Sequence, residues 1–199
     1  MEPLTLIFIG PQGSGKGTQI SKLKDFLAKT DSSREILDVQ TGRLFRVVMA
    51  KQETFAEKKI TRTLNEGVLQ PDFLTYVLWG QEMIKNLDPD KHLLIDGFPR
   101  TIDQAKTLAS ALSFFERKNI HIINLDTPRE VVLGRMQSRA RADDTPESIE
   151  KRLAWYEKDT LPVLDFYRQQ DNVQVHDIKG DDTIEEVQEN IKVFLKLKQ

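Results

Sequence analysis

GPQGSGKGTQ, residues 10–19, is the stretch that decides the fold. It follows a short apolar run, LTLIFI at 4–9, and leads into a helical pattern that starts near Thr18. Glycines let backbone N–H groups converge on a phosphate, the start of a helix adds positive potential, and Lys16 supplies a mobile charge. Strand, glycine-rich loop and helix in this order predict a nucleotide phosphate site.

One position of this loop departs from the usual form. The usual loop ends in Gly-Lys followed by a Ser or Thr whose hydroxyl holds Mg²⁺. Here Gly17 fills that place and Thr18 comes one residue later. The loop is therefore either damaged or built for a different arrangement of metal and phosphate.

Length and composition bound what the chain can do. Its 199 residues suffice for one well-cored domain with a small insertion. Lys and Arg total 29 against 31 Asp and Glu, so the net charge of -2 gives no overall attraction to nucleic acid or to an anionic membrane. The absence of Cys excludes disulfides, thiolate metal sites and a Cys nucleophile, and it fits a reducing cytosol. With no signal-like or membrane-spanning run, we expect a soluble cytoplasmic protein.

Short apolar runs alternate with longer amphipathic segments along the chain. The apolar runs are mostly continuous, as is typical of strands covered on both faces, and they lie at 4–9, 35–40, 92–97, 120–125 and 173–178. The helical patterns lie at 18–29, 42–49, about 53–66, 73–86, 102–118, 129–139, 146–169 and 183–197. This order predicts an α/β fold with a five-stranded parallel sheet.

Two stretches interrupt the plain alternation, the helices within 40–91 and the Arg-rich ARADDTPES at 140–148. Ligands of such folds bind at the carboxyl ends of the strands, so insertions there are candidate covers for a site. LLIDGFPRT at 93–101 adds a second signal at the same edge. Asp96 ends a buried strand and can orient a metal or its water, and Arg100 points a guanidinium at the same opening.

Six motifs then follow one another over nearly the whole chain: GPQGSGKGTQ (10–19), TGRLFR (41–46), EGVLQPD (66–72), LIDGFPRTIDQA (94–105), LGRMQSRARADD (133–144) and EKRLAWY (150–156). In this order they resemble the adenylate kinases, within the wider family of nucleoside monophosphate (NMP) kinases. The resemblance implies a monomer with a single P-loop kinase domain over 1–199, a three-layer α/β sandwich around the five-stranded parallel sheet. It also implies a helical NMP-binding insertion at about 40–70 and a very short, minimal lid at about 138–144.

The resemblance also accounts for the unusual loop. The family's own loop has Gly in the place of the usual Ser or Thr and Thr after it, so Gly17 resembles an intact family form. Because the usual hydroxyl ligand is absent, we expect Mg²⁺ to be held mainly by phosphate oxygens and water. Asp96 would order some of that water.

The reaction implied by the resemblance is reversible transfer of the γ-phosphoryl group of ATP to AMP, giving two ADP. It brings about six negative charges together, and because the acceptor oxygen is already anionic it needs no general base. It needs cations and in-line positioning, and arginine suits this because its fork binds phosphate bidentately. The implied catalytic residues are Lys16, Arg100, Arg135, Arg139, Arg141 and Arg152. Asp143 and Asp144 resemble the family's lid-base carboxylates and are expected to anchor these arginines.

Two nucleotide sites follow from the same resemblance. The implied ATP site comprises Gly13, Ser14, Gly15, Lys16, Gly17, Thr18, Arg135, Arg139 and Gly180. The implied AMP site comprises Thr41, Gly42, Arg46, Gly67, Val68, Leu69, Gln70, Gly97, Arg100, Gln104, Arg141 and Arg152. Gln104 and Thr41 favour AMP, since a Gln amide pairs bidentately with an adenine edge and the pyrimidine-directed relatives carry Asn and Ala there.

Three features depart from the family pattern. Arg43 stands where the family usually has Asp, which either weakens a lid latch or replaces it by a contact to phosphate or to a carboxylate. Gln70 replaces a usual apolar residue of the acceptor pocket. Only Ala140 fills the place where other members insert a loop or a small domain, so we expect the helices at 129–139 and 146–169 to close as one hinged hairpin.

Two other interpretations stay open. The first is a UMP/CMP-type or other small-molecule P-loop kinase, against which Gln104 and Thr41 argue. The second is a nucleotide-binding sensor without turnover, which Arg43 keeps open. Lys16, Asp96 and the arginines argue against a sensor, because a mere binder has little use for a full transition-state clamp. A GTPase switch is disfavoured because the chain has no Asn/Thr-Lys-x-Asp run.

The histidines and tryptophans are expected to be structural. His92, His121 and His176 lie in or beside strands, where packing or edge polarity explains them better than catalysis. Trp79 and Trp155 lie on amphipathic helices and are expected to fill the core or the walls of the site.

Overall fold

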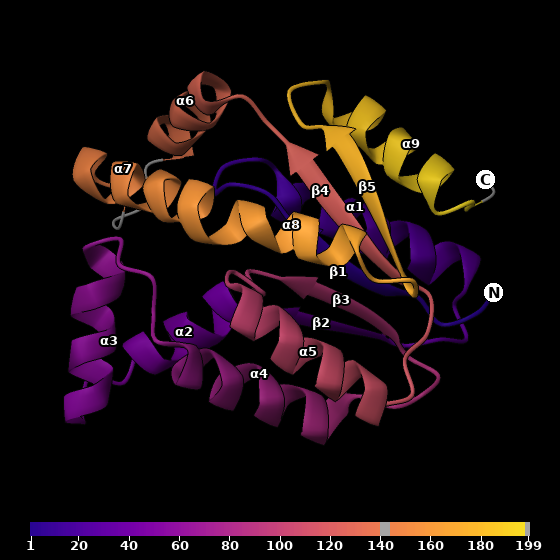
Figure 1. Ribbon diagram of the computed structural model, residues 1–199, viewed down its shortest axis with the longest axis horizontal. Helices are drawn as coiled ribbons and strands as arrows, with labels where there is room; N and C mark the ends of the chain where they lie inside the picture. Colours follow the sequence, from indigo (N-terminus) through magenta and orange to yellow (C-terminus); the bar gives the residue numbers. More distant parts are fainter. Residues whose placement is uncertain (140–143, 198–199) are drawn as a thin grey trace.

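A five-stranded parallel sheet forms the centre of the computed structural model, which describes residues 1–139 and 144–197 (Figure 1). The strands are β1 (Thr5–Ile9), β2 (Ile36–Gln40), β3 (His92–Asp96), β4 (Ile120–Asp126) and β5 (Val173–Lys179). They lie in the order β2-β3-β1-β4-β5, and each neighbouring pair is parallel. The predicted parallel sheet is confirmed.

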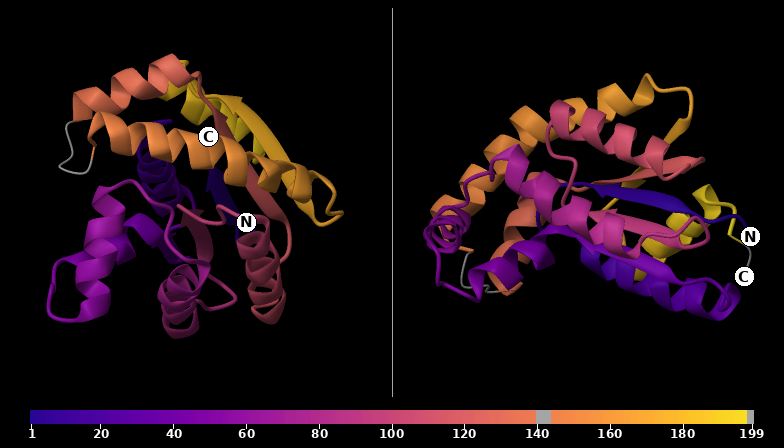
Figure 2. Two further views of the ribbon diagram at one scale, coloured as in Figure 1. Left: turned by 60° about the vertical axis from the view of Figure 1, so that its left-hand side comes forward. Right: turned by 90° about the horizontal axis from the view of Figure 1, so that it is seen from below.

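Helices cover both faces of this sheet (Figure 2). They are α1 (Lys16–Thr30), α2 (Thr41–Met49), α3 (Phe55–Asn65), α4 (Asp72–Asn86), α5 (Ile102–Phe114), α6 (Arg129–Arg139), α7 (Pro146–Trp155), α8 (Leu161–Arg168) and α9 (Ile184–Phe194). One face packs against α1 and α9, and the other against α4, α5 and α8. None of the helices in the described residues is long and apolar enough to cross a membrane.

The central strand β1 shows why the apolar runs are continuous. Its Leu6 and Phe8 belong to the core under α1 and α9, whereas Ile7 and Ile9 belong to the core under α4, α5 and α8. Burying one such side chain contributes about 1.5–3 kcal/mol, so both faces of the strand stabilise the fold. The sheet is therefore a rigid platform whose carboxyl ends share one edge.

The segment predicted as one helix at 146–169 contains a change of helical type. Between α7 and α8 lies a π-helical turn, Tyr156–Thr160, and α8 carries a proline in its first turn. Because Pro162 has no N–H to donate, the regular bonding pattern cannot continue through it, and one wide turn absorbs the mismatch. Tyr156 and Thr160 are both buried.

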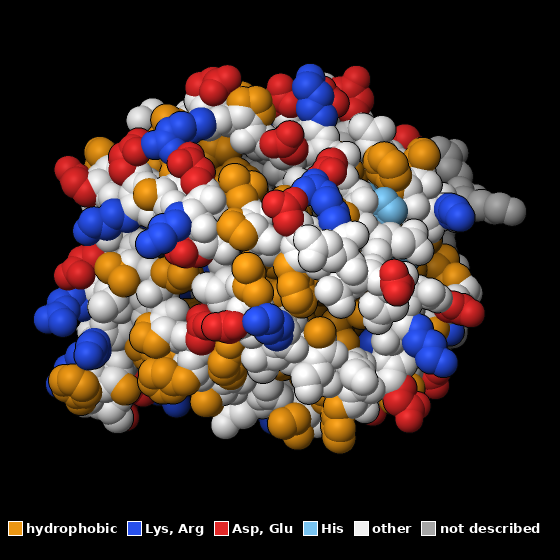
Figure 3. All heavy atoms as spheres, viewed as in Figure 1, with side chains coloured by type: hydrophobic (Ala, Val, Ile, Leu, Met, Phe, Trp, Pro, Cys, Tyr) orange, Lys and Arg blue, Asp and Glu red, His pale blue; other side chains and the backbone are white. Residues whose placement is uncertain are grey.

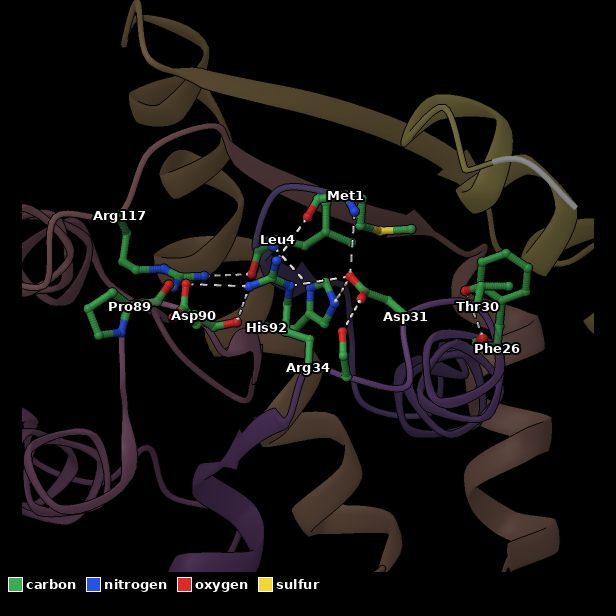
Figure 4. Close-up of polar contacts among 11 residues, drawn as sticks. Met1, Leu4, Phe26, Thr30, Asp31, Arg34, Pro89, Asp90, His92 and Arg117 are labelled. Carbon is green, nitrogen blue, oxygen red and sulfur yellow. Dashed lines mark hydrogen bonds and ion pairs between the residues drawn. The ribbon is translucent and has the colours of Figure 1, made fainter.

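A polar network joins the chain segments at the opposite edge, where the strands begin (Figure 4). His92 is fully buried, and its Nδ1 accepts a hydrogen bond from the N–H of Leu4 at 3.0 Å. The neutral ring therefore carries its proton on Nε2, which lies 3.3 Å from Oδ2 of Asp31. Arg34 binds Asp31 at 3.2 Å and donates to the carbonyl oxygen of Asp90 at 2.6 Å. His92 has the structural role that its place in a strand predicts.

Burial lowers the pKa of His92 below its ordinary value, and the Asp31 carboxylate offsets this only in part. Below about pH 6.5 the unfolded chain therefore binds more protons than the folded chain, and stability falls as the pH falls. We predict that His92→Gln, which does not titrate, loses less free energy of unfolding than the wild type between about pH 7.5 and about pH 5 in urea titrations. His121 and His176 also have lowered pKa values, so part of the loss remains. An equal loss in both proteins would contradict this account.

Candidate active site

Residues 10–19 form the connection between β1 and α1, at the carboxyl end of the central strand. Gly15 caps the helix with a φ of 97°, in the left-handed region that glycine adopts readily. The chain then enters α1 at Lys16, and no acidic residue lies in the first turn. The first N–H groups of a helix lack helical partners and carry partial positive charge. The predicted order of strand, glycine-rich loop and helix is confirmed.

A cavity of about 840 Å³ opens beside this loop. Its size suits a nucleotide. Every residue expected in the ATP site lines it: Gly13, Ser14, Gly15, Lys16, Gly17, Thr18, Arg135, Arg139 and Gly180. Asp96, the residue expected to order the metal's water, lines it too.

A second cavity of about 510 Å³ adjoins the first. Of the residues expected in the AMP site, it is lined by Thr41, Gly42, Arg46, Gly67, Val68, Leu69, Gln70, Gly97, Arg100 and Arg152. Phe45, Met49 and Leu64 add apolar walls that suit a planar base. Arg141 lies outside the described residues.

The two cavities meet at a junction of six residues that line both: Gln12, Gly42, Arg46, Gly97, Arg100 and Trp155. Gln12 was not singled out from the sequence, because a neutral amide in a glycine loop carries no signature of its own. Its Oε1 is buried without a hydrogen-bond partner in the described part of the chain. Trp155 was expected only to fill the core or a site wall, and the structure places it at the junction.

The two cavities are lined by more positive than negative side chains. Figure 3 shows Lys and Arg intermixed with Asp and Glu on the face in view. Among the described residues, the cavities are lined by Lys16, Lys22, Arg46, Arg100, Arg135, Arg139 and Arg152, against the carboxylates of Asp96 and Asp182. Such an excess of cations in a concave site favours a polyanionic ligand.

Lys16 is held by the loop itself. Its Nζ donates to the carbonyl oxygens of Gly10 at 2.7 Å and Pro11 at 2.9 Å. Burial lowers the pKa of Lys16 to about 8, while Asp96 raises it and two nearby arginines lower it further. A bound phosphate would compete with two neutral carbonyls for this ammonium, and it would stabilise the charged form.

Arg100 is fixed in place with its end free. Its Nε donates to the carbonyl oxygen of Gly97 at 2.6 Å, and its guanidinium carbon lies 4.8 Å from the ring centre of Trp155. Its two terminal nitrogens donate to no residue within 1–139 or 144–197. Burial lowers the pKa of Arg100 to about 10, with Asp96 raising it and Arg152 lowering it, so the group stays charged at neutral pH. This leaves a planar fork ready for a phosphate.

One carboxylate holds two of the arginines together. Asp144 accepts from Arg139 at 2.6 and 3.0 Å and from Arg152 at 2.7 Å. The side chain of Asp144 is 1% exposed. Burial alone would raise the pKa of Asp144, but the two guanidinium groups outweigh it and hold this pKa below its ordinary value. Asp144 therefore anchors the arginines, as the sequence predicted; Asp143 lies outside the described residues.

Arg135 ties the loop to the turn after β5. Its Nη1 donates to the carbonyl oxygen of Gly180 at 2.8 Å and lies 3.5 Å from that of Ser14. A Cβ atom on Gly180 would lie 2.0 Å from Oγ1 of Thr127, so a larger residue would require the Thr127 side chain to move. The backbone of the turn after β5 can thus form one wall of the large cavity.

Two residues lie elsewhere than the sequence suggested. Gln104 is 1% exposed and lines neither cavity, because its Oε1 accepts from the N–H of Arg100 at 2.8 Å and its Nε2 donates to Asp72 at 2.7 Å. Asp72 is distant in sequence, at the start of α4, so this pairing was not visible beforehand. Arg43 is exposed, donates to the carbonyl oxygen of Asp38 at 2.7 Å and also lines neither cavity.

Comparison with known proteins shows which family the chain resembles in sequence. A family model described as adenylate kinase matches residues 8–172. An adenylate kinase of Cyanothece sp. is 40% identical over 176 residues, which are 86% of each chain. Adenylate kinase 1 of Nostoc sp. is 36% identical over 190 residues, 96% of this chain and 97% of the relative. An adenylate kinase of Bifidobacterium longum is 36% identical over 168 residues, 82% of this chain and 86% of the relative.

The lowered pKa of Lys16 predicts proton uptake on ligand binding. With a pKa of about 8 in the free protein, about half of the Lys16 side chains are uncharged at pH 8. ATP phosphates raise this pKa, so Lys16 itself should take up about half a proton near pH 8 and almost none near pH 6.5, measured as the difference from Lys16→Met because protons lost by ATP are common to both proteins. Calorimetry in buffers of different ionisation enthalpy measures this uptake. It should be missing from Lys16→Met, and its absence from the wild type at pH 8 would refute the assigned role.

The contacts of Asp144 with Arg139 and Arg152, which we call the Asp144 clamp, predict a loss of stability when Asp144 is replaced. Asp144→Ala leaves two guanidinium groups close together without their shared carboxylate, which should lower the free energy of unfolding by about 2–4 kcal/mol. We place the value below the largest such losses because the Arg139 side chain is 25% exposed. Urea unfolding measures the effect, with the exposed Glu147→Ala in the first turn of α7 as control. Equal stability of the two variants would show that the clamp contributes little.

Proposed function

The chain belongs to the adenylate kinase family and transfers a phosphoryl group reversibly from ATP to AMP, giving two ADP; we propose that the transfer takes place at the junction of the two cavities. One observation carries the proposal: two adjoining cavities of about 840 and 510 Å³ share a junction that contains the free fork of Arg100. The large cavity would hold ATP and the smaller one AMP. Their phosphates would then meet at Arg100.

We assign the phosphate contacts from the way each cation is held. Lys16 and the backbone N–H groups at the start of α1 would bind the phosphates of ATP, helped by Arg135 and Arg139. Arg46 and Arg100 would bind the phosphate of AMP. Arg152 would act on the group in transfer, together with Arg141, which lies outside the described residues.

Mg²⁺ is the cofactor that we propose for this reaction. Asp96 fits it, because this residue lines the large cavity and its Oδ1 is buried without a hydrogen-bond partner among the described residues. No group of three metal-ligating side chains occurs in the described part of the chain, so Asp96 would act alone and through water. When bound, Mg²⁺ would neutralise part of the negative charge on the phosphates.

The side chains of the junction supply the rest of the chemistry. AMP presents an anionic oxygen, so the protein has to hold the two nucleotides in line rather than remove a proton. Lys16 would move from its two carbonyl acceptors to the phosphates, and Arg100 would stabilise charge on the group in transfer without reorienting. The neutral residues Gln12 and Trp155 would help to exclude water, which limits transfer to solvent.

The parts of the molecule can be assigned to the two substrates in the same way. We propose that about 40–70 is the NMP-binding insertion and that about 138–144, of which 140–143 lie outside the described residues, is the lid, within one domain that acts as a cytoplasmic monomer. In the free protein the amide of Gln104 is bound to Asp72. To contact adenine it would have to exchange that partner, so AMP binding would draw Gln104 out of its present hydrogen bonds.

A coupled assay of ADP formation from Mg·ATP tests the function. The wild type should form ADP with AMP and not with CMP, UMP, GMP or water as acceptor. Lys16→Ala should lose about 10²–10³-fold in kcat, the range found when a transition-state donor is removed, whereas Lys29→Ala at the exposed end of α1 should keep full activity.

Two outcomes of this assay would contradict the proposal. Activity with pyrimidine acceptors alone would move the protein to the UMP/CMP-type kinases. Nucleotide binding without acceptor-dependent turnover would identify a nucleotide sensor.

A further inference from the structure

One face of α7 contacts the end of α3 and the start of the connection to α4. Ser148, Arg152 and Trp155 are spaced so that they share this face of the helix. The Nη2 of Arg152 donates to the carbonyl oxygen of Leu64 at 3.2 Å, and the Nε1 of Trp155 donates to that of Gly67 at 3.2 Å. Gly67 lies so close that a Cβ atom on it would be 2.5 Å from the carbonyl oxygen of Ser148. The helix is therefore fixed directly on residues 64–67, the end of α3 and the start of the connection to α4, which we call the acceptor loop.

The same tryptophan reaches Arg100 with its ring. The guanidinium carbon of Arg100 lies 4.8 Å from the ring centre of Trp155, a distance at which the ring face attracts a cation. Thr160, at the end of the π-helical turn, donates to the carbonyl oxygen of Arg100 at 3.1 Å. The carbonyl oxygen of Gly97 accepts a hydrogen bond from Nε of Arg100 at 2.6 Å and fixes that side of the guanidinium. The ring of Trp155 then limits how the rest of the guanidinium can turn about this hydrogen bond.

Trp79, the other tryptophan, lies in the core and not at the junction of the cavities. Trp79 is 4% exposed and stacks on Phe98 in the core, with ring centres 5.2 Å apart. Trp79 lines neither cavity, whereas Trp155 lines both. The indole of Trp155 is thus the tryptophan whose surroundings should change when a nucleotide binds.

We propose that Trp155 is a positioning residue for phosphoryl transfer, which orients the guanidinium of Arg100 and couples it to the acceptor loop. The inference rests on the proposed function of the junction. AMP that enters the smaller cavity contacts the loop containing Gly67, whose carbonyl oxygen is bound to the indole N–H. A shift of that loop would move the indole, and the indole ring would in turn reorient the guanidinium of Arg100. ATP fills the other cavity and does not contact this loop.

Two substitutions separate the ring from the N–H. Trp155→Phe keeps a ring face for Arg100 and loses the bond to Gly67, whereas Trp155→Leu loses both. We expect kcat/KM for AMP to fall about threefold in the Phe variant and about thirtyfold in the Leu variant, through a higher KM for AMP and a lower kcat. The KM for ATP should change less than about twofold in both. The exposed Lys151→Ala on the same helix should behave as the wild type.

A purely structural role would give a different pattern. It predicts that the KM values for ATP and AMP change by the same factor, or that the Phe variant is no better than the Leu variant; either result would overturn the proposal. Unfolding midpoints of all variants establish that each is folded at the assay temperature.

Fluorescence tests the coupling without turnover. AMP should change the tryptophan emission of the wild type, and this change should be missing from Trp155→Phe, because Trp79 is enclosed in the core. An equal AMP-induced change in both proteins would refute the coupling. If the wild type binds AMP but forms no ADP, the proposed function fails while the fluorescence result still decides the link between Trp155 and the acceptor loop.

Discussion

Positive side chains have to stay close together in the free protein, before any phosphate is present, and the site is built around this constraint. At the junction the cations are held by neutral groups, Lys16 by two backbone carbonyls and Arg100 by one carbonyl and the Trp155 ring. Farther out, Asp144 holds two arginines. Phosphate displaces a neutral carbonyl more readily than a carboxylate, and it can bind the terminal nitrogens of Arg100 while the Trp155 ring stays in place. The cations nearest the reacting group are thus held by groups that compete only weakly with a phosphate. Burial destabilises the charged forms of Lys16 and Arg100 in the free protein and therefore lowers both pKa values.

The sheet supplies the stability that lets the protein hold these positive side chains close together. Strands buried on both faces give a rigid platform, and the parallel arrangement brings Asp96, the loop at 10–19 and the turn at 180–182 to one edge. The polar network around His92 stabilises the opposite edge, so the two ends of the sheet have separate tasks. Loops at the carboxyl edge can then carry charge, while the strands below them supply most of the stability.

The sequence predicted the fold well because periodicity and continuous apolar runs are local signals. The family resemblance, rather than any local signal, indicated most of the residues that line the two cavities; it missed Gln12 and included Gln104, which lines neither. The sequence could not show that Gln104 is bound to Asp72, or that the ring of Trp155 lies against Arg100, because these contacts join segments far apart in the chain. The π-helical turn at 156–160 was missed for a different reason, since Pro162 signals an interruption of the helix but does not specify its geometry.

The central claim is that two nucleotides bind with their phosphates meeting at Arg100. A crystal structure with diadenosine pentaphosphate, which joins two adenosines through five phosphates, tests it most directly. The account predicts one adenosine in each cavity, a phosphate chain within hydrogen-bond distance of the terminal nitrogens of Arg100, and Lys16 moved from the carbonyl oxygens of Gly10 and Pro11 to the phosphates. Both adenosines outside the smaller cavity, or a phosphate chain that passes Arg100 without contact, would contradict it.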